Sequence, residues 1–370
     1  MNILIAPDKF KGSLTAQQVC DAVCDGIIAR HSSWSIVKAP LADGGDGTCE
    51  ILTSISGGKL VQVKVRDPLF REIESSYGIS DDGTTAFIEM AKASGLQLLK
   101  INERNPRRTS TIGTGDLIAD ALSRGARKII IGCGGSATND GGIGMAVALG
   151  VSFRDLDGRE LQPIGDSLSR IHSIKQEGIN SEVAHCKFIL LNDVDNPLIG
   201  PEGAAFTYAR QKGASDDAMV SLDHGLKNFA EVLEQYFPGA SNFPGAGAAG
   251  GLPVSARVFL NTDIKSGIEF ILDFSRIEEK VKSANLVITG EGKFDNQSLH
   301  GKVVSGLARI CRQYHKPLWV VCGVSDVSES QWRELGIEKV IPIAPDAPSL
   351  EESMRNAAKL IQEKVSSVIY

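Results

Sequence analysis

The chain lacks several features that mark large classes of protein. No segment approaches the ~18 uninterrupted apolar residues of a membrane-spanning helix, and the apolar stretch at residues 3–6 is too short for a secretion signal. The seven cysteines include no Cys-x-x-Cys pair, which argues against a zinc site or a disulfide framework. We therefore expect a cytoplasmic protein with free thiols and no membrane partner.

Basic runs and familiar catalytic motifs are also missing. The 39 Lys and Arg residues face 45 Asp and Glu residues, and no basic cluster stands out, so we expect no nucleic-acid partner. The chain contains no GxxxxGK[ST] loop, no HExxH pair and no GxSxG elbow. The sequence signals of P-loop nucleotide binding, zinc proteolysis and acyl transfer are thus absent.

Glycine, by contrast, is abundant. The chain has 39 glycines in 370 residues, or about one in ten against a usual ~7%. They follow no three-residue period, so we expect them in turns and at close approaches of the backbone.

The two ends of the chain share one pattern. Apolar runs predict strands at 3–6, 35–39, 286–289, 317–322 and 340–343, alternating with helical patterns at 15–27, 302–314 and from 349. Thr15-x-x-Gln18 predicts a capping box for the first helix. Such alternation is typical of a parallel sheet.

The middle of the chain differs. Short runs at 60–65, 72–78 and 84–90 predict an antiparallel meander, followed by strands at 128–131 and 187–191 and helices at 114–124, 139–149 and 215–236. We therefore predict an α/β fold of two domains. A Rossmann-like parallel-sheet domain comprises residues 1–58 plus 282–370, and an inserted α/β (α+β) domain comprises residues 59–281.

Polar loops follow the predicted strands. Asp8, Lys11 and Ser13 come after the first strand and before a helix, a place that favours anions. Asp43 and Asp46 lie among glycines after the second strand, where carboxylates could hold Mg²⁺ or simply form turns. Asp193 and Asp195 follow a third strand, and either could act as a general base, a metal ligand or a turn cap.

Two further loops are rich in glycine or charge. Gly132-x-Gly134-x-x-Ala137, with Asp155 about 20 residues on, fits a relaxed dinucleotide fingerprint and supports an alternative function, an NAD-dependent oxidoreductase of a small hydroxy acid. Residues 289–302 carry the largest set of polar types in one loop. These are Glu291, Lys293, Asp295, Gln297, Ser298 and Lys302.

Read together and in order, these loops resemble the bacterial glycerate kinase family. The matching segments are APDKFKGS (6–13), ADGGDGT (42–48), TIGTGD (111–116), GGSATNDGG (134–142), DVDNPL (193–198), QKGA (211–214), PGAGAAGG (244–251), KSG (265–267) and TGEGKFDNQS (289–298). The resemblance covers nearly the whole chain. It implies transfer of the γ-phosphoryl group of ATP, with Mg²⁺, to D-glycerate, giving 2-phosphoglycerate, in a cleft between two α/β domains.

The resemblance also suggests a role for each loop. Asp193, Lys11 and Asp43 would be catalytic, with Asp193 or Asp43 accepting the hydroxyl proton or holding Mg²⁺. ATP would be bound by Gly134, Gly135, Ser136, Thr138, Asn139, Lys293 and Lys302. D-Glycerate would be bound by Asp8, Ser13, Glu291, Asp295, Gln297 and Ser298, and Lys11 would bind either a phosphate or the glycerate carboxylate. The sequence leaves the assembly open, a homodimer included.

Overall fold

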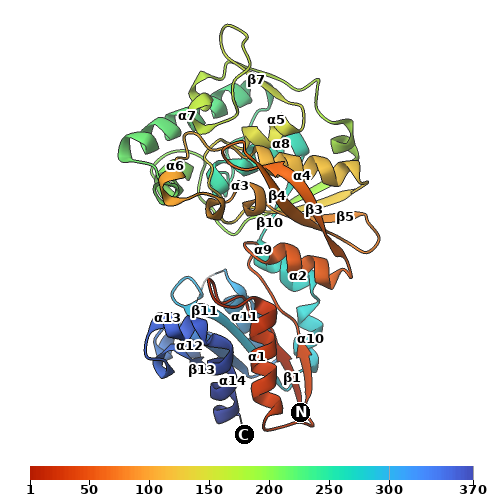
Figure 1. Ribbon diagram of the computed structural model, residues 1–370, viewed down its shortest axis with the longest axis vertical. Helices are drawn as coiled ribbons and strands as arrows, with labels where there is room; N and C mark the ends of the chain where they lie inside the picture. The colour runs from red at the N-terminus through yellow and green to blue at the C-terminus, as the bar shows by residue number, and fades with distance from the viewer. Residues whose placement is uncertain (300, 370) are drawn as a thin grey trace. The chain divides into compact units, whose positions relative to one another are not determined.

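A computed structural model describes residues 1–299 and 301–369 and divides into two compact units (Figure 1). Unit 1 consists of Met1–Asp43 and Ile268–Tyr370, and unit 2 of Gly44–Gly267. Relative to the ranges expected above, residues 44–58 and 268–281 lie in the other unit. The reason is packing: α2 (Thr48–Ile55) lies against strands of unit 2, whereas α10 (Ile277–Ser283) lies against a strand of unit 1.

Unit 1 is a parallel five-stranded sheet built from both ends of the chain, as predicted. The strands are β1 (Asn2–Ile5), β2 (Ser35–Lys38), β11 (Leu286–Phe294), β12 (Leu318–Ser325) and β13 (Ile337–Pro342), in the spatial order β13-β12-β11-β1-β2. The helices, besides α10, are α1 (Ala16–Ile28), α9 (Gly267–Phe274), α11 (Val303–Gln313), α12 (Glu329–Glu334), α13 (Leu350–Arg355) and α14 (Ala357–Val368).

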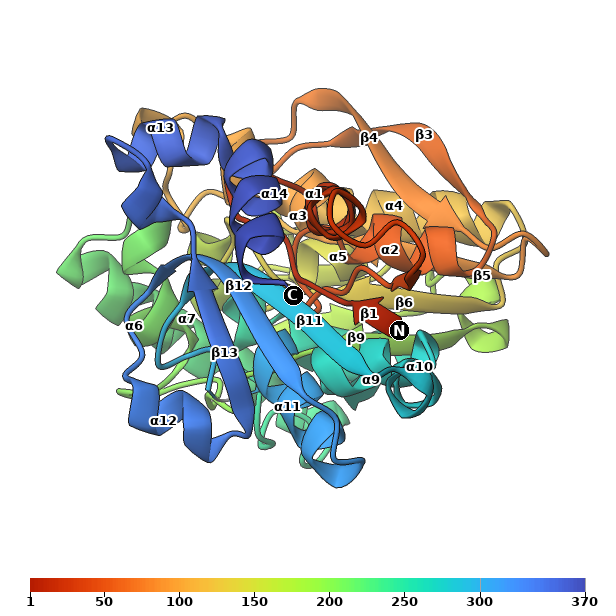
Figure 2. The same cartoon turned by 90° about the horizontal axis from the view of Figure 1, so that it is seen from below.

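Alternation along the strands gives this sheet two apolar faces. Ile3 and Ile5 of β1 pack with residues of α1 and α14, while Leu4, also buried, points to the opposite face. Figure 2 shows α1 and α14 on one side of the sheet and α10 and α11 on the other. The predicted capping box is present at the start of α1, where Thr15 and Gln18 each accept a hydrogen bond from the other's main chain.

Unit 2 contains a six-stranded mixed sheet. The predicted meander is confirmed as β3 (Lys59–Arg66), β4 (Glu72–Ile79) and β5 (Thr85–Glu89), which pair antiparallel. Parallel pairing then joins β5 to β6 (Lys128–Gly132), β9 (Lys187–Leu191) and β10 (Asp263–Lys265), in the order β10-β9-β6-β5-β4-β3. A separate pair is formed by β7 (Ser152–Arg154) and β8 (Ser173–Lys175).

The helices of unit 2 cover this sheet and extend a second core. They are, besides α2, α3 (Ala91–Ser94), α4 (Ile112–Ser123), α5 (Ile143–Ala148), α6 (Ala204–Tyr208), α7 (Asp216–Tyr236) and α8 (Leu252–Leu260). Ile129 and Ile131 of β6 share one apolar cluster with residues of α4, α5 and α8. A second cluster centres on Phe229 of α7 and Phe153 of β7. No helix in the described part of the chain is both long and apolar enough to cross a membrane.

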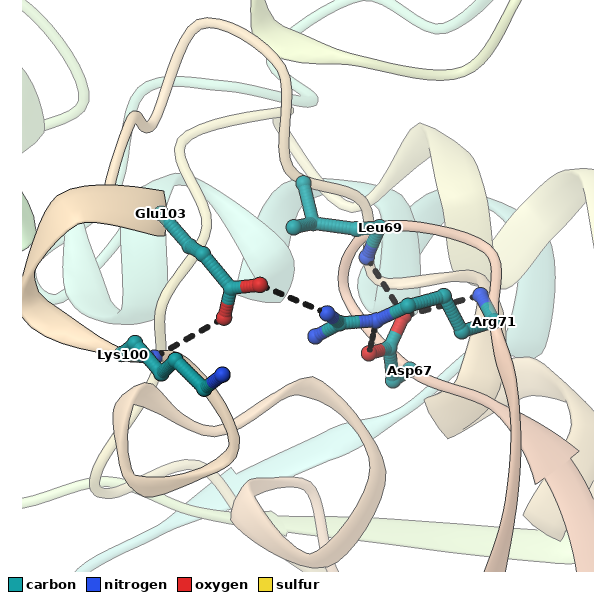
Figure 3. Close-up of polar contacts among 5 residues, drawn as sticks. All are labelled: Asp67, Leu69, Arg71, Lys100 and Glu103. Atoms are coloured by element: carbon teal, nitrogen blue, oxygen red, sulfur yellow. Dashed lines mark hydrogen bonds and ion pairs between the residues drawn. The ribbon is translucent and has the colours of Figure 1, made fainter.

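A buried carboxylate fixes the turn between β3 and β4 (Figure 3). The Asp67 side chain is 1% exposed and accepts hydrogen bonds from the main-chain N–H groups of Leu69 (2.8 Å) and Arg71 (2.9 Å) and from the Arg71 guanidinium. Arg71 also donates to Glu103 (2.8 Å), whose other oxygen accepts from the N–H of Lys100 (3.0 Å). The network secures the start of residues 104–111, which border the loop after β6.

Three elements differ substantially from the expected ones. Strand β11 runs to Phe294 rather than 289, because its ladder with β12 continues through Lys293↔Val324 to Phe294↔Ser325. The helix expected over 139–149 is confined to α5, since the residues before it form a loop. The helix expected from 349 is interrupted at Asn356 and forms α13 and α14.

Candidate functional site

The order of the strands in unit 1 indicates where a ligand would bind. The chain leaves β1 toward β2 on one side, and leaves β11 toward β12 on the other. Ligands in open parallel sheets bind at such a reversal, outside the carboxyl ends of the strands. The loop after β1 and the end of β11 meet here, since the N–H of Asp8 donates to the carbonyl of Gly290 (2.8 Å).

Two buried carboxyl groups lie at this reversal. Asp8 and Glu291 are each 8% exposed. Burial raises the pKa of Asp8 to about 6 against the opposing charge of Lys9. Burial likewise raises the pKa of Glu291 to about 7, with Asp8 adding to the shift and Ser298 and Lys302 opposing it. The Oε1 atom of Glu291 has no hydrogen-bond partner among the described residues.

Lys9 links Asp8 to Asp43. Its Nζ lies 3.6 Å from Oδ1 of Asp8 and 3.7 Å from Oδ1 of Asp43. The structure therefore brings Asp43 to the same cluster of unit 1 as Asp8. Lys9 was not among the predicted site residues, although it stands inside the quoted 6–13 segment.

Lys11 and Ser13 lie on the outer part of the same loop. The Lys11 side chain is exposed, whereas the Ser13 hydroxyl donates to the main-chain carbonyl of Met354 in α13. Ser13 thus has a structural contact as well as its predicted substrate-binding role. Lys11 is the more open of the two toward an anion in solution.

The loop that follows β11 is stabilised by its own side chains. Ser298 is buried, donates to the carbonyl of Lys293 and accepts from the N–H of Asp295, while Oδ1 of Asp295 accepts from the N–H of Gln297. Lys293 is exposed, and its Nζ lies 2.9 Å from Oδ2 of Asp326. Lys302, the remaining predicted residue of this loop, is the N-cap of α11.

In unit 2, the loop at residues 132–142 follows β6 and packs tightly. A Cβ on Gly134 would lie 3.0 Å from the Cα of Gly45, so glycine permits this approach. Ser136 is 8% exposed, and Thr138 and Asn139 are fully buried. Within the described chain, neither the Thr138 hydroxyl nor the Asn139 amide group has a hydrogen-bond partner. Buried polar groups are rarely left unsatisfied, so this loop is poised for further polar contacts.

Neighbouring segments hold the loop in place. The Thr109 hydroxyl donates to the carbonyl of Ala137 (2.8 Å). The buried Asp140 carboxylate accepts from the N–H groups of Thr111 (2.8 Å), Gly142 (3.1 Å) and Gly144 (3.2 Å) and from the Thr111 hydroxyl. Burial raises the pKa of Asp140, and these hydrogen bonds oppose the shift.

Asp193 lies directly beyond the carboxyl end of β9, in the same unit. Its Oδ1 atom accepts hydrogen bonds from the Ser266 hydroxyl (2.7 Å) and the N–H of Gly267 (2.9 Å), just after β10. The side chain is nevertheless exposed. Cys133 directly follows β6. Its pKa is raised mainly by burial and, as the second cause, by the nearby charge of Asp193. The ends of β6, β9 and β10 therefore meet around Asp193.

A buried lysine in this unit was missed. Lys212 is 2% exposed, and its Nζ donates to the carbonyl of Thr138 (2.7 Å). The sequence analysis quoted Lys212 only within the 211–214 segment, and nothing in that polar stretch signals burial.

The dinucleotide fingerprint has no structural counterpart. Asp155, the acidic residue that it requires, accepts hydrogen bonds from the N–H groups of Asp157 and Arg159 in a turn after β7. The helix that follows the glycines, α5, has only 6 residues and begins after Asp140, Gly141 and Gly142. The 132–142 loop is therefore not a dinucleotide-binding turn of the Rossmann type.

The described side chains do not form a complete binding site for a divalent cation on their own. Within residues 1–299 and 301–369, no three acidic, histidine or cysteine side chains converge as a metal group. Kinase Mg²⁺, however, is usually held by one or two carboxylates together with the phosphates of the nucleotide. In unit 1, Glu291 has a buried carboxylate oxygen without a described partner, and in unit 2, Asp193 has a hydrogen-bonded, exposed carboxylate, so each unit separately offers one carboxylate of the kind that Mg²⁺ prefers.

Two α/β units whose parallel strands end in glycine-rich, charged loops define an α/β protein suited to anionic small molecules. The model of the glycerate kinase family matches residues 3–370. The chain is 41% identical to the glycerate kinase of Bacillus cereus (strain ATCC 10987 / NRS 248) over 100% of this chain and 97% of that protein. It is 41% identical to the glycerate 2-kinase of Escherichia coli (strain K12) over 96% of this chain and 94% of that protein.

A solved structure agrees with these relatives. The crystal structure of a protein provisionally described as glycerate kinase 2, from Salmonella typhimurium LT2, matches with a TM-score of 0.87 and 37% identity, over 100% of this chain and 97% of that one. The chain belongs to the glycerate kinase family. It is accordingly a glycerate kinase, a phosphotransferase that uses ATP, and the oxidoreductase alternative is wrong.

Proposed function

We propose that this kinase transfers the γ-phosphoryl group of ATP to the 2-hydroxyl of D-glycerate, which yields 2-phosphoglycerate. The choice of the 2-hydroxyl rests on the E. coli relative, whose name is glycerate 2-kinase. The observation that carries the chemistry is the Asp193 carboxylate, fixed through one oxygen by Ser266 and Gly267 yet exposed to an incoming substrate.

Asp193 would orient the acceptor hydroxyl and take its proton. A carboxylate held in one orientation suits this role, because phosphoryl transfer depends mainly on alignment and charge rather than on covalent help from the protein. Asp43 is the competing candidate, and its neighbours Lys9 and Asp8 supply charge of both signs.

Anion binding would fall to the loops. In unit 2, Gly134, Gly135, Ser136, Thr138 and Asn139 would hold the phosphates of ATP. In unit 1, Lys293 and Lys302 would add positive charge for ATP, while Asp8, Ser13, Glu291, Asp295, Gln297 and Ser298 would bind glycerate. Lys11 would bind a phosphate or the glycerate carboxylate.

Mg²⁺ would be held by Asp193 or Asp43 together with ATP. When bound, it would offset the negative charge that the phosphates carry and develop during transfer. Glu291 is a third carboxylate to consider, because its buried Oε1 lacks a partner within the described chain.

A coupled assay with ATP and D-glycerate tests the proposed function, with the phosphorylated carbon read by ³¹P–¹H NMR of the product. We expect 2-phosphoglycerate and no turnover of NAD with hydroxy acids. Formation of 3-phosphoglycerate would overturn the position, and failure to consume ATP with glycerate would overturn the substrate.

A further inference from the structure

Lys212 is a charged side chain that the proposed reaction does not yet use. It ends η5 (Arg210–Lys212), a short 3-10 turn before α7. Gly213 follows with φ of 97°, and a Cβ there would collide with the main chain of Arg104. This tight turn directs Lys212 inward, where its Nζ donates to the carbonyl of Thr138 at 2.7 Å.

The position is unfavourable for an ammonium group. A buried charge is strongly destabilising unless it is paired and hydrogen-bonded. Asp140 is near enough to influence Lys212, but its carboxylate already accepts four hydrogen bonds from Thr111, Gly142 and Gly144. Burial lowers the pKa of Lys212 to about 7, against the opposing influence of Asp140 and Cys133.

The other charged and titratable groups around Lys212 do not supply a strong partner. Cys133 is a buried thiol whose pKa is raised to about 12, chiefly by its burial, so it is a weak counter-charge for Lys212. Asp193 and Tyr208 are each linked electrostatically to Cys133. Arg104, packed on Gly213, carries the same sign of charge.

The loop that Lys212 contacts also contains unsatisfied groups. The Thr138 hydroxyl and both polar atoms of the Asn139 amide are buried without partners in the part of the chain that the structure describes. Lys212 therefore donates to the main chain of Thr138, a residue whose own side chain, like that of the adjacent Asn139, lacks hydrogen bonds within the described chain. A phosphate at this loop would supply both the negative charge and the acceptor oxygens that the cluster lacks.

We propose that Lys212 is the positioning residue of the 132–142 loop, holding its main chain at Thr138 and supplying the buried positive charge that a phosphate group of ATP needs on binding there. The proposal deepens the proposed function and rests on it. In the unliganded protein Lys212 is largely neutral above pH 7, and it takes up a proton when the phosphate binds. A net proton transfer therefore accompanies ATP binding.

Calorimetric titration of MgATP into the full-length protein tests this at pH 8, in Tris and in HEPES, whose different ionisation enthalpies reveal proton uptake. We expect the wild type to take up about one proton per ATP beyond a control titration. Lys212→Met should abolish that uptake and weaken ATP binding about 10- to 100-fold, as loss of a charge-assisted hydrogen bond predicts.

Two further variants separate charge from structure. Lys212→Gln retains a neutral donor for the Thr138 carbonyl, and we expect it to fold yet still lose proton uptake and affinity. Lys227→Met removes an exposed lysine of α7 and should match the wild type in both measurements. Thermal unfolding of each variant shows whether it folds. If Lys212→Met fails to fold, Lys212→Gln still provides the test.

The outcomes separate this proposal from the proposed function. If wild type binds ATP without proton uptake, or if Lys212→Gln keeps wild-type uptake and affinity, the role of Lys212 is overturned while the kinase assignment stands. If the wild type instead fails to phosphorylate glycerate, the proposed function fails, whatever the calorimetry shows.

Discussion

The two units differ in the ionisable groups that they bury near the ends of their parallel strands. Unit 1 buries the acids Asp8 and Glu291 and leaves Lys11 exposed, whereas unit 2 buries a lysine, Lys212, along with the acid Asp140 and leaves Asp193 exposed. Desolvation disfavours the charged form in each case, so it raises the pKa of the acids and lowers that of the lysine. The pKa values of Asp8, Glu291 and Lys212 all fall at about 6 to 7, so near neutral pH each of these buried groups is closer to its neutral form than its ordinary pKa would allow.

The contrast suggests complementary ligands. A buried carboxyl group regains its charge when a cation arrives, and a buried lysine does so when an anion arrives. The exposed groups, Asp193 and Lys11, lie at the surface and can act on substrate directly. The following predictions test this division, from the largest expected effect to the smallest.

Substitution of Asp193 tests the exposed acid of unit 2. Asp193→Asn keeps the size and the acceptor oxygen but removes the basic carboxylate, so we expect kcat to fall by about 10²- to 10⁴-fold. Because the side chain is exposed, the thermal midpoint should stay within about 2 °C of the wild type. Steady-state assays and thermal unfolding monitored by circular dichroism measure the two effects.

The companion variant is Asp195→Asn, which removes the other candidate carboxylate of the same loop, an exposed side chain two residues further along. It should retain kcat within about threefold. Near wild-type turnover by Asp193→Asn would remove the general-base role and leave Asp43 as the candidate.

The pH dependence of stability tests the buried lysine. The folded protein binds the Lys212 proton with a pKa of about 7 rather than 10.5, so the unfolded state binds more protons between these values. The wild-type free energy of unfolding should therefore rise with pH in this window, and Lys212→Met should lack that rise. The difference between the two curves should change by up to about 5 kcal/mol. Denaturant titrations from pH 6.5 to 10 measure it, and parallel curves would show that Lys212 is not desolvated as described.

Glu291 should show the opposite slope. Its folded pKa of about 7 lies above its ordinary value of 4.5, so the folded state binds more protons between these values. This stability is fully present below pH 4.5 and is lost as the pH rises to 7. Glu291→Gln should lack the loss and gain about 3 kcal/mol over the wild type by pH 8. Chemical denaturation at pH 5 and pH 8 compares the two proteins, and an equal difference at both values would contradict the assignment.

The sequence predicted the sheets better than the burial of charges. Continuous apolar runs identified β1, β6 and β9, since strands covered on both faces need apolar residues throughout. Glycine and charge led to an early end for β11 at 289, but pairing with β12 carries the strand to Phe294. Long-range pairing overrode the local signal there.

For the candidate site, too, local sequence signals were informative and long-range contacts were not predictable. Asp8, Asp193 and Glu291 were proposed from the sequence because polar residues after apolar runs fall at the carboxyl ends of strands. Lys212 was not, because its burial arises from Gly213 packing on Arg104, a contact between segments distant in sequence. The local sequence of residues 211–214 shows no pattern from which that contact could be predicted.

Substitution of Lys11 gives the smallest expected effect and completes the comparison with Lys212. Lys11 is exposed rather than buried, so Lys11→Ala should raise one KM value about tenfold, leave kcat within about threefold and cause no proton-linked change in binding. The substrate whose KM rises distinguishes phosphate binding from glycerate carboxylate binding. Unchanged KM values for both ATP and glycerate would remove Lys11 from the site. A loss of proton uptake like that expected for Lys212→Met would instead show that burial does not separate the two lysines, and the division between the units would fail at that point.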